Sequence, residues 1–220
     1  MVTPRRDVKT RNTQWAQNLA KFVAERTNIT PNDISVMSVL FGAVAFAAYC
    51  SYNFLPPNLY ALVPIVAIFG IQMRLICNLI DGMVAVEGGK KSAVGDIYNE
   101  FPDRLSDTLI IVGLGIAGGN WFSISLGLLA ALFAMFTAYT RVLGGAIGAN
   151  QYFIGPMAKQ HRMALITVAN VICLGDFIIP NLHHPVSQIT LIIITLGCII
   201  TVARRVKNIA KDLVEKSKEV

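Results

Sequence analysis

Three long stretches without a charged side chain constrain this sequence more than any other feature. No Asp, Glu, Lys or Arg occurs in residues 34–73, 108–140 or 177–203. A helix needs about 20 apolar residues to cross the hydrocarbon core of a bilayer, and each stretch is long enough for at least one crossing. Only 15% of the 220 residues are charged, whereas a soluble domain usually carries about 25%. The sequence therefore predicts an all-α, polytopic membrane protein.

Breaks rich in proline or glycine divide the apolar sequence into six predicted transmembrane helices. Residues 53–58, 118–121 and 180–186 form these breaks, because proline pairs and glycine-rich turns do not continue a helix. The predicted spans are residues 33–52, 59–86, 94–117, 121–146, 160–179 and 187–204.

Among the loops of this predicted topology, only alternate ones carry lysine or arginine. The three breaks carry none, whereas the N-terminal segment, the other connections and the C-terminal tail are basic. By the positive-inside rule, both termini are expected in the cytoplasm, as in a multi-pass protein of a bacterial inner membrane. The net charge of +6 then reflects topology and attraction to anionic membrane lipids, and no nucleic-acid partner is expected.

An amphipathic helix is predicted before the first span. Trp15, Leu19, Phe22 and Val23 follow helical spacing and form one apolar stripe, which is typical of a helix lying in the membrane interface. We therefore divide the chain into three parts. They are a cytoplasmic interfacial segment (1–29), a six-helix transmembrane domain (30–204) and a basic cytoplasmic tail (205–220).

The start of the first span carries its own signal. Thr30 is expected to cap the helix, Pro31 to occupy its first position, and Asp33 to favour the positive end of the helix dipole.

Polar residues recur on one face of each of two neighbouring predicted spans. On the second span, Asn78 and Asp81 share a face; on the third, Asn99, Asp103 and Asp107 do so. The short connection predicts that the two spans are antiparallel neighbours whose polar faces meet. Carboxylate and amide oxygens suit Mg²⁺ or Mn²⁺, although acidic groups solvated at the water interface would show the same pattern.

Basic residues lie close to this polar set in the predicted topology. Arg74 shares the face of Asn78 and Asp81 and is expected to balance acidic charge or hold a phosphate. Lys159 and Arg162 lie three positions apart where the fifth span begins, an arrangement that suits a phosphate group. Ordinary positive-inside charge explains this second pair equally well.

The spacing of residues 78–103 resembles the motif of the CDP-alcohol phosphatidyltransferases, D-x2-D-G-x2-A-R-x8-G-x3-D-x3-D. The chain reads Asn78-x2-Asp81-Gly82-x2-Ala85-Val86-x8-Gly95-x3-Asn99-x3-Asp103. It departs from the motif at three positions, since Asn78 and Asn99 replace aspartates and Val86 replaces the arginine. The resemblance extends over nearly the whole chain, including the surface helix and the six spans.

The resemblance implies an enzyme that transfers a phosphatidyl or related phosphoalcohol group from a CDP-linked lipid to an alcohol, with release of CMP, in phospholipid biosynthesis. The implied metal ligands are Asn78, Asp81, Asn99 and Asp103. Asp103 is also the implied catalytic base. The implied substrate-binding residues are Gly82, Ala85 and Gly95, with Arg74, Lys159 and Arg162 as phosphate-binding candidates. The partners that the resemblance implies for this protein are CDP-diacylglycerol or a similar CDP-alcohol, an alcohol acceptor, membrane lipids and a second copy of the chain.

The three departures weaken the enzymatic interpretation but not the fold. Two aspartates replaced by amides remove two negative charges, so metal affinity should fall or a single ion should bind. Glu100 and Asp107 could compensate for these charges, and Arg74, Lys90 or Lys91 could replace the missing arginine. A catalytically impaired relative that binds CDP-lipid, and a small transporter, remain alternatives.

Overall fold

A computed structural model describes residues 13–87, 93–179 and 181–218, and every regular element in these ranges is helical. The α-helices are α1 (Gln14–Arg26), α2 (Pro31–Ser51), α3 (Leu62–Glu87), α4 (Gly95–Ala117), α5 (Trp121–Ala146), α6 (Lys159–Cys173) and α7 (His183–Lys216). Short 3-10 helices follow α2 and α6, namely η2 (Tyr52–Phe54), η3 (Pro57–Leu59) and η4 (Leu174–Phe177). The all-α prediction is confirmed.

The start of α2 forms as its sequence predicts. The Thr30 side chain accepts a hydrogen bond from the Asp33 amide at 3.2 Å, and the Asp33 carboxylate accepts one from the Thr30 amide at 2.9 Å. This reciprocal capping box satisfies two amides that a helix end leaves without partners. Pro31 occupies the first turn, where its missing N–H costs nothing.

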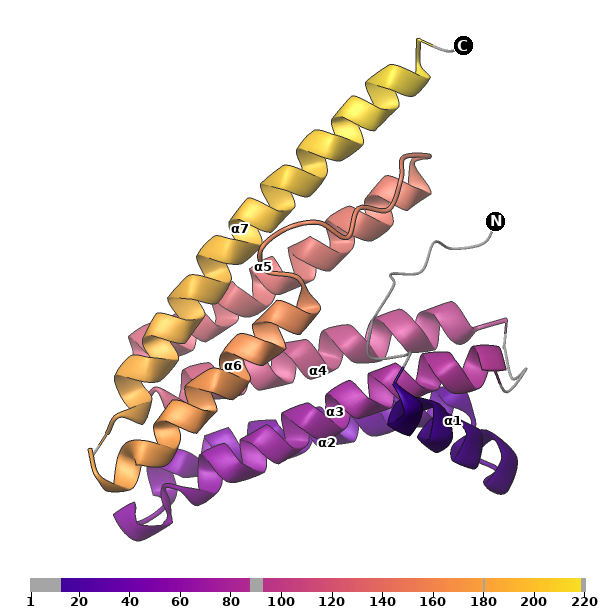
Figure 1. The fold of residues 1–220 in the computed structure, drawn as a ribbon. Helices are drawn as coiled ribbons and strands as arrows, with labels where there is room; N and C mark the ends of the chain where they lie inside the picture. Colours follow the sequence, from indigo (N-terminus) through magenta and orange to yellow (C-terminus); the bar gives the residue numbers. More distant parts are fainter. Residues whose placement is uncertain (1–12, 88–92, 180, 219–220) are drawn as a thin grey trace.

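The helices form two groups that converge at one end of the molecule and splay apart at the other (Figure 1). In the first group, α2 packs extensively against both α3 and α4, which contact each other far less, and α1 lies against α3. In the second, α5 packs along α7, and α6 packs against α7 and also contacts α3. The helix α4 contacts α5 and thereby joins the two groups.

Small residues allow the helix backbones to approach closely. A Cβ added at Gly42 of α2 would lie 3.1 Å from Ser106 of α4, and one at Gly115 of α4 would lie 2.9 Å from the Gly127 Cα of α5. Such contacts are typical of helix packing in membranes, where apolar burial drives association less than in water.

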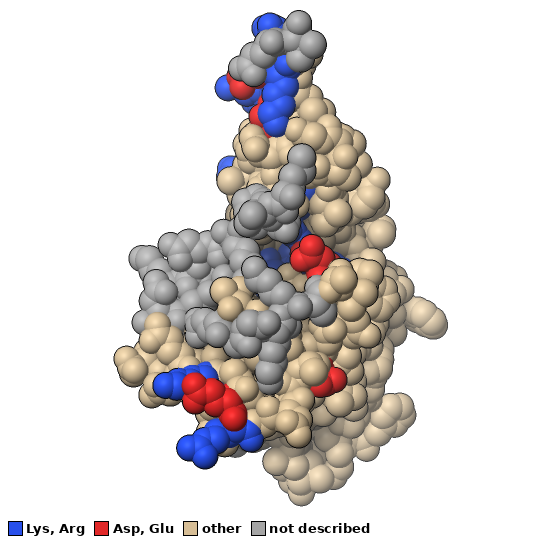
Figure 2. Space-filling view, turned by 90° about the vertical axis from the view of Figure 1, so that its right-hand side faces the viewer, with Lys and Arg blue, Asp and Glu red and all other residues tan. Residues whose placement is uncertain are grey.

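Four of the described helices are long and apolar enough to span a membrane. They lie within Pro31–Phe54, Pro57–Val86, Trp121–Ala146 and His183–Lys216. Large apolar side chains on them face outward, for example Leu40 (62% exposed) and Phe69 (55% exposed). In Figure 2, the charged atoms on the face shown gather in small groups, while most of the described surface is uncharged. A surface this apolar suits lipid better than water, so the chain is an integral membrane protein.

Two of the six predicted spans do not meet the same criterion. The helix α6 has 15 residues before it tightens into η4, and α4 carries several charged residues in its first half. Both nevertheless run alongside the longer helices (Figure 1). Their membrane crossing therefore stays a prediction.

The last helix is longer than predicted. Instead of ending near residue 204, α7 continues to Lys216, so most of the predicted tail is a continuation of this helix. The Asp212 carboxylate accepts hydrogen bonds from the Asn150 backbone N–H at 2.6 Å and from its side chain at 3.1 Å. These contacts tie the extension to the loop after α5.

The first helix is present, but its apolar stripe faces outward. Trp15 and Phe22 are 47% and 58% exposed, whereas Ala16 and Ala20 are buried in a cluster with residues of α3. The helix therefore packs on the protein through its alanines and leaves its large apolar side chains free.

Candidate active site

Two aspartates on α4 lie inside the bundle. Asp103 and Asp107 are one helical turn apart and are 6% and 3% exposed. Because a buried carboxylate must find charged or hydrogen-bonding partners to offset its lost hydration, the surrounding helices supply cations to both.

Arg74 of α3 contacts both aspartates with one nitrogen. Its Nη2 atom lies 2.6 Å from Asp107 Oδ1 and 3.2 Å from Asp103 Oδ1, and it also donates to the Asp103 backbone carbonyl at 3.3 Å. Arg74 is fully buried. Since α3 and α4 otherwise contact each other little, Arg74 is a principal polar link between them.

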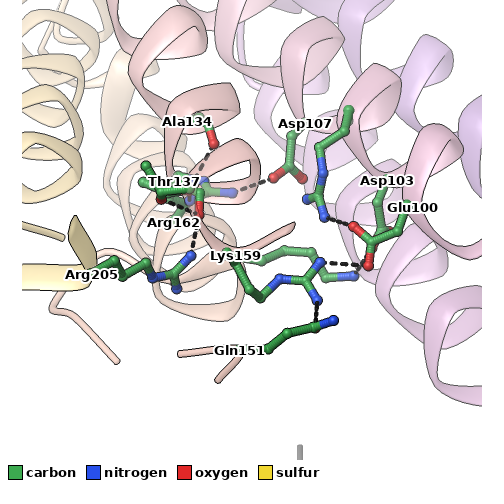
Figure 3. Close-up of polar contacts among 12 residues, drawn as sticks. Glu100, Asp103, Asp107, Ala134, Thr137, Gln151, Lys159, Arg162 and Arg205 are labelled. Carbon is green, nitrogen blue, oxygen red and sulfur yellow. Dashed lines mark hydrogen bonds and ion pairs between the residues drawn. The ribbon is translucent and has the colours of Figure 1, made fainter. Parts of the chain in front are cut away.

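The beginning of α6 supplies two further cations. Lys159 forms an ion pair with Asp103 Oδ2, and Arg162 lies 2.7 Å from Asp107 Oδ2. Figure 3 shows Lys159 and Arg162 extending from α6 toward these two carboxylates. We call the five residues Arg74, Asp103, Asp107, Lys159 and Arg162 the ion-pair cluster.

The two basic residues of α6 differ in their access to solvent. The Lys159 side chain is 28% exposed, whereas that of Arg162 is 1% exposed. Arg162 also donates to Thr137 Oγ1 at 3.2 Å and to the Met157 carbonyl at 2.8 Å. Lys159 is therefore partly accessible from outside the protein, while Arg162 is held within it. Phosphate binding by Arg162 stays a prediction.

Asp81 of α3 lies beside this cluster. It is 5% exposed, and its Oδ2 atom accepts a hydrogen bond from Ser35 of α2 at 2.7 Å. Its Oδ1 atom accepts from the Gly82 amide at 2.5 Å. The polar faces of α3 and α4 meet where Arg74 pairs with Asp103 and Asp107, and Asp81 lies seven positions after Arg74 on α3.

The two asparagines of the motif are placed differently. Asn78 lies one turn before Asp81, and its Nδ2 atom is buried without a hydrogen-bond partner among the described residues. Asn99 is exposed near the start of α4. Asn78 thus adds a polar group beside Asp81, whereas Asn99 faces outward.

The small motif residues lie on the same helices. Gly82, Ala85 and Gly95 are partly buried near the ends of α3 and α4 that flank the undescribed connection, and Val86 is 47% exposed. Lys90 and Lys91, two candidates to replace the motif arginine, lie outside the described residues. The third candidate, Arg74, is committed to Asp103 and Asp107.

Both expected acidic substitutes are engaged in ion pairs. Asp107 is held by Arg74 and Arg162. Glu100 pairs with Arg104, one turn along α4, and with Arg141 of α5. The guanidinium of Arg141 also donates to Gln151 at 3.1 Å and lies 5.1 Å from the Phe153 ring centroid. Glu100 therefore adds no free negative charge to the site and instead forms a second set of ion pairs with Arg104 and Arg141.

Some of these partners could have been found in the sequence and others could not. The spacing of Glu100 and Arg104 is that of a helical ion pair. In contrast, Ser35 and Asp81 are 46 positions apart, and nothing in the pattern around Ser35 distinguishes it from a residue that packs helices.

The residues present fit one divalent cation better than two. Asp81 and Asp103 can offer hard oxygen ligands, and the side-chain oxygen of Asn78 is a further candidate one turn before Asp81 on α3. No group of three or more His, Cys, Asp or Glu side chains with metal-binding geometry occurs in the described part of the chain. With two carboxylates and two neighbouring cations, this set carries little negative charge for a second ion.

Comparison with known proteins gives relatives in sequence and in fold. No protein-family model matches the chain. An uncharacterized protein of Aquifex aeolicus is 28% identical over 190 residues, covering 84% of this chain and 85% of the relative. An archaetidylinositol phosphate synthase of Pyrococcus horikoshii is 25% identical over 154 residues, covering 69% and 76% of the two chains.

Solved structures of a phosphatidylinositol phosphate synthase from Mycobacterium tuberculosis share the arrangement of helices. The structure with CDP-DAG bound matches with a TM-score of 0.66 at 15% identity, covering 90% of this chain and 94% of the other. A complex of the same enzyme with manganese and citrate matches with a TM-score of 0.64 at 16% identity, covering 88% of each chain. These comparisons confirm the resemblance read from the motif: the chain has the fold of the CDP-alcohol phosphatidyltransferases.

Proposed function

We propose that this protein is a CDP-alcohol phosphatidyltransferase that transfers a phosphatidyl or related phosphoalcohol group from a CDP-linked lipid to an alcohol. The observation that carries the proposal is the buried polar set where three helices meet, in which Arg74 of α3 and Lys159 of α6 both pair with Asp103 of α4. Asp81, also buried, lies seven positions after Arg74 on α3. The similarity to phosphatidylinositol phosphate synthase in fold and to archaetidylinositol phosphate synthase in sequence supports it.

The surroundings of the two aspartates suit a polar nucleotide attached to a lipid. The lipid-facing surface of the helices is apolar, whereas Lys159 and Arg141 bring positive charge to the region around Asp103 and Glu100. Such an arrangement would hold acyl chains in the bilayer and a pyrophosphate at the membrane surface.

Asp103 is the residue best placed to activate the acceptor. As a base, it would take the proton of the acceptor hydroxyl while the hydroxyl oxygen forms its bond to the phosphorus nearer the lipid. The bond from that phosphorus to the CMP oxygen breaks, and CMP leaves with the bonding electrons. Arg74 fixes the position of the Asp103 carboxylate through Oδ1. A bound Mg²⁺ or Mn²⁺ would neutralise the pyrophosphate and stabilise the negative charge of the leaving CMP.

The membrane arrangement belongs to the same proposal. We place all six helices from α2 to α7 across the bilayer, with α4 and α6 packed against the more apolar spans. The splayed end, which carries the basic residues, then faces the cytoplasm with both termini. The exposed Trp15 and Phe22 of α1 would lie in the interface of this membrane, which we assign to the bacterial inner membrane. The last part of the proposal is that two copies of this chain form a homodimer.

The test is release of CMP by the purified protein in lipid nanodiscs. CDP-diacylglycerol is supplied with Mg²⁺ or Mn²⁺ and a panel of alcohols that includes inositol phosphate, because both relatives of known activity make inositol phosphate lipids. Acceptor-dependent CMP release supports the proposal. Equal CMP release by the Asp81→Ala, Asp103→Ala and unaltered proteins would refute the roles given to these residues.

A second candidate function is binding of CDP-lipid without turnover. The replacement of motif aspartates by Asn78 and Asn99 favours it, as does the engagement of both Asp103 oxygens by cations. Retention of CDP-diacylglycerol without CMP release under any acceptor or metal would identify this function.

A further inference from the structure

One cation in the ion-pair cluster can leave its place more easily than the others. Arg74 and Arg162 are at most 1% exposed and each makes several contacts. Lys159 is 28% exposed and stands at the first position of α6. Its single flexible side chain reaches inward to Asp103 (Figure 3).

Lys159 pairs with a carboxylate of the proposed metal site, because its ammonium group contacts Asp103 Oδ2. The ammonium group thus supplies positive charge to a carboxylate that would ligate a divalent cation. Two cations cannot share a position so close together, because their repulsion in a poorly solvated site is large.

The backbone that carries Lys159 is firmly anchored. If Lys159 leaves Asp103, only its side chain therefore has to move. The Met157 amide donates to Thr201 Oγ1 of α7 at 3.0 Å. Gly155 adopts a φ of +122° and approaches Thr201 so closely that an added Cβ would lie 2.4 Å from it. Because the start of α6 is fixed, the long and flexible Lys159 side chain can move its charge between Asp103 and a second partner without moving the backbone.

We propose that Lys159 competes with the divalent cation for Asp103 and, when displaced, pairs with the phosphate of the CDP-linked substrate. Metal and substrate then assist one another: the metal frees Lys159, and the substrate gives the freed ammonium an anionic partner. Metal binding to the protein alone is weakened by this competition. The proposal rests on the proposed function for the identity of the substrate, but its central claim concerns metal affinity.

The experiment measures Mn²⁺ binding by the electron paramagnetic resonance signal of free Mn²⁺, with the protein in nanodiscs. Lys159→Gln is expected to bind Mn²⁺ about tenfold more tightly than the unaltered protein without nucleotide, within the usual range for coupled sites. Lys159→Arg keeps the charge and is expected to remain near the unaltered affinity. Lys211→Gln is the matched control, because it removes the same charge from a side chain that is 76% exposed and pairs with Glu215 one turn along α7.

A second arm adds CDP-diacylglycerol to the nanodiscs, with protein-free nanodiscs subtracted for Mn²⁺ held by the lipid. The gain in Mn²⁺ affinity on adding this lipid is expected to be about tenfold smaller in Lys159→Gln than in the unaltered protein. Unchanged or weaker Mn²⁺ binding by Lys159→Gln, in a protein whose thermal unfolding matches the control, would overturn the competition.

The outcomes separate this inference from the proposed function. Tighter Mn²⁺ binding in Lys159→Gln without CMP release by the unaltered protein would support the competition and refute the enzyme. CMP release with no change in Mn²⁺ affinity would support the enzyme and refute the competition.

Discussion

The two ends of the helix bundle bury carboxylates in opposite ways. In the ion-pair cluster toward the splayed end, Asp103 and Asp107 are held by arginine and lysine side chains from α3 and α6. At the converging end, Asp176 of η4 is 2% exposed and accepts hydrogen bonds from the Tyr52 hydroxyl at 2.9 Å and the His183 backbone amide at 2.9 Å. We call Tyr52, Asp176 and His183 the converging-end cluster.

Aromatic packing adds to the rigidity of the converging-end cluster. The Tyr52 ring stacks on His183 with centroids 4.5 Å apart and on Tyr60 with centroids 4.6 Å apart. The His183 side chain has no exposure to solvent. Nothing in this cluster resembles the partly exposed lysine of the ion-pair cluster.

The difference teaches which buried acid serves function and which serves structure. A carboxylate held by neutral, buried donors keeps its partners and joins segments of chain. A carboxylate whose partner is a partly exposed ammonium can exchange that partner for another cation or a substrate proton. On the proposed function, we therefore expect chemistry at the ion-pair cluster and structural stabilisation at the converging-end cluster.

The largest expected effect is on catalysis by Asp103→Asn. The amide cannot accept the acceptor's proton, so CMP release should fall by roughly 10²- to 10⁴-fold, the usual contribution of a general base. The measurement is the initial rate of CMP release per folded protein. Asp176→Asn is the matched control, since it makes the same change in the converging-end cluster and should leave this rate within about threefold. Equal losses in both variants would remove the distinction between the two clusters.

The next effect is on stability, through Arg74→Met. Methionine removes one of the two cationic partners of each buried carboxylate, which should cost about 3–5 kcal/mol of unfolding free energy. The measurement is the denaturant midpoint in mixed micelles. Adding Asp107→Asn should restore part of the loss, because one of the uncompensated charges is then removed. A loss no larger than that of Lys21→Met, whose side chain is 70% exposed, would show that Arg74 is not a structural link.

A smaller effect is expected for Asp176→Asn itself. One oxygen remains to accept a hydrogen bond, but the amide nitrogen faces a donor, so unfolding free energy should fall by about 1–3 kcal/mol. The same denaturant titration measures it. His183→Phe is a useful companion, because it keeps an aromatic ring against Tyr52 and the backbone amide that donates to Asp176. A larger loss in His183→Phe than in Asp176→Asn would place the stabilisation in the histidine ring instead of the carboxylate.

Local signals in the sequence predicted much of the fold. Thr30, Pro31 and Asp33 fixed the start of α2 through capping chemistry, and residues 118–120 separate α4 from α5 as expected. These predictions rest on interactions between residues a few positions apart. The end of α7 could not be read in this way, because its extension is held by contacts between Asp212 and Asn150 from a distant part of the chain.

The same limit applies to the candidate site. Helical spacing placed Asn78 with Asp81 and Asp103 with Asp107, since residues on one face of a helix can be identified from the sequence. It could not show that Arg162 would be buried against Asp107, or that Lys159 would reach Asp103. Those partners depend on how α6 packs beside α3 and α4, and no periodicity within one helix contains that information.

The smallest expected effect is the loss of stability in Tyr52→Phe, and it tests the difference between the two clusters most directly. The change removes one hydroxyl that donates to Asp176 and keeps the stacked ring, so unfolding free energy should fall by about 0.5–1.5 kcal/mol. Thr137→Val is the matched change beside the ion-pair cluster, because it removes a hydroxyl that accepts from Arg162. Denaturant midpoints measure both stabilities, and CMP release is measured on the same samples. If the converging end is only structural, Tyr52→Phe should lower stability without changing the KM for CDP-diacylglycerol, whereas a raised KM would show that the two ends are coupled.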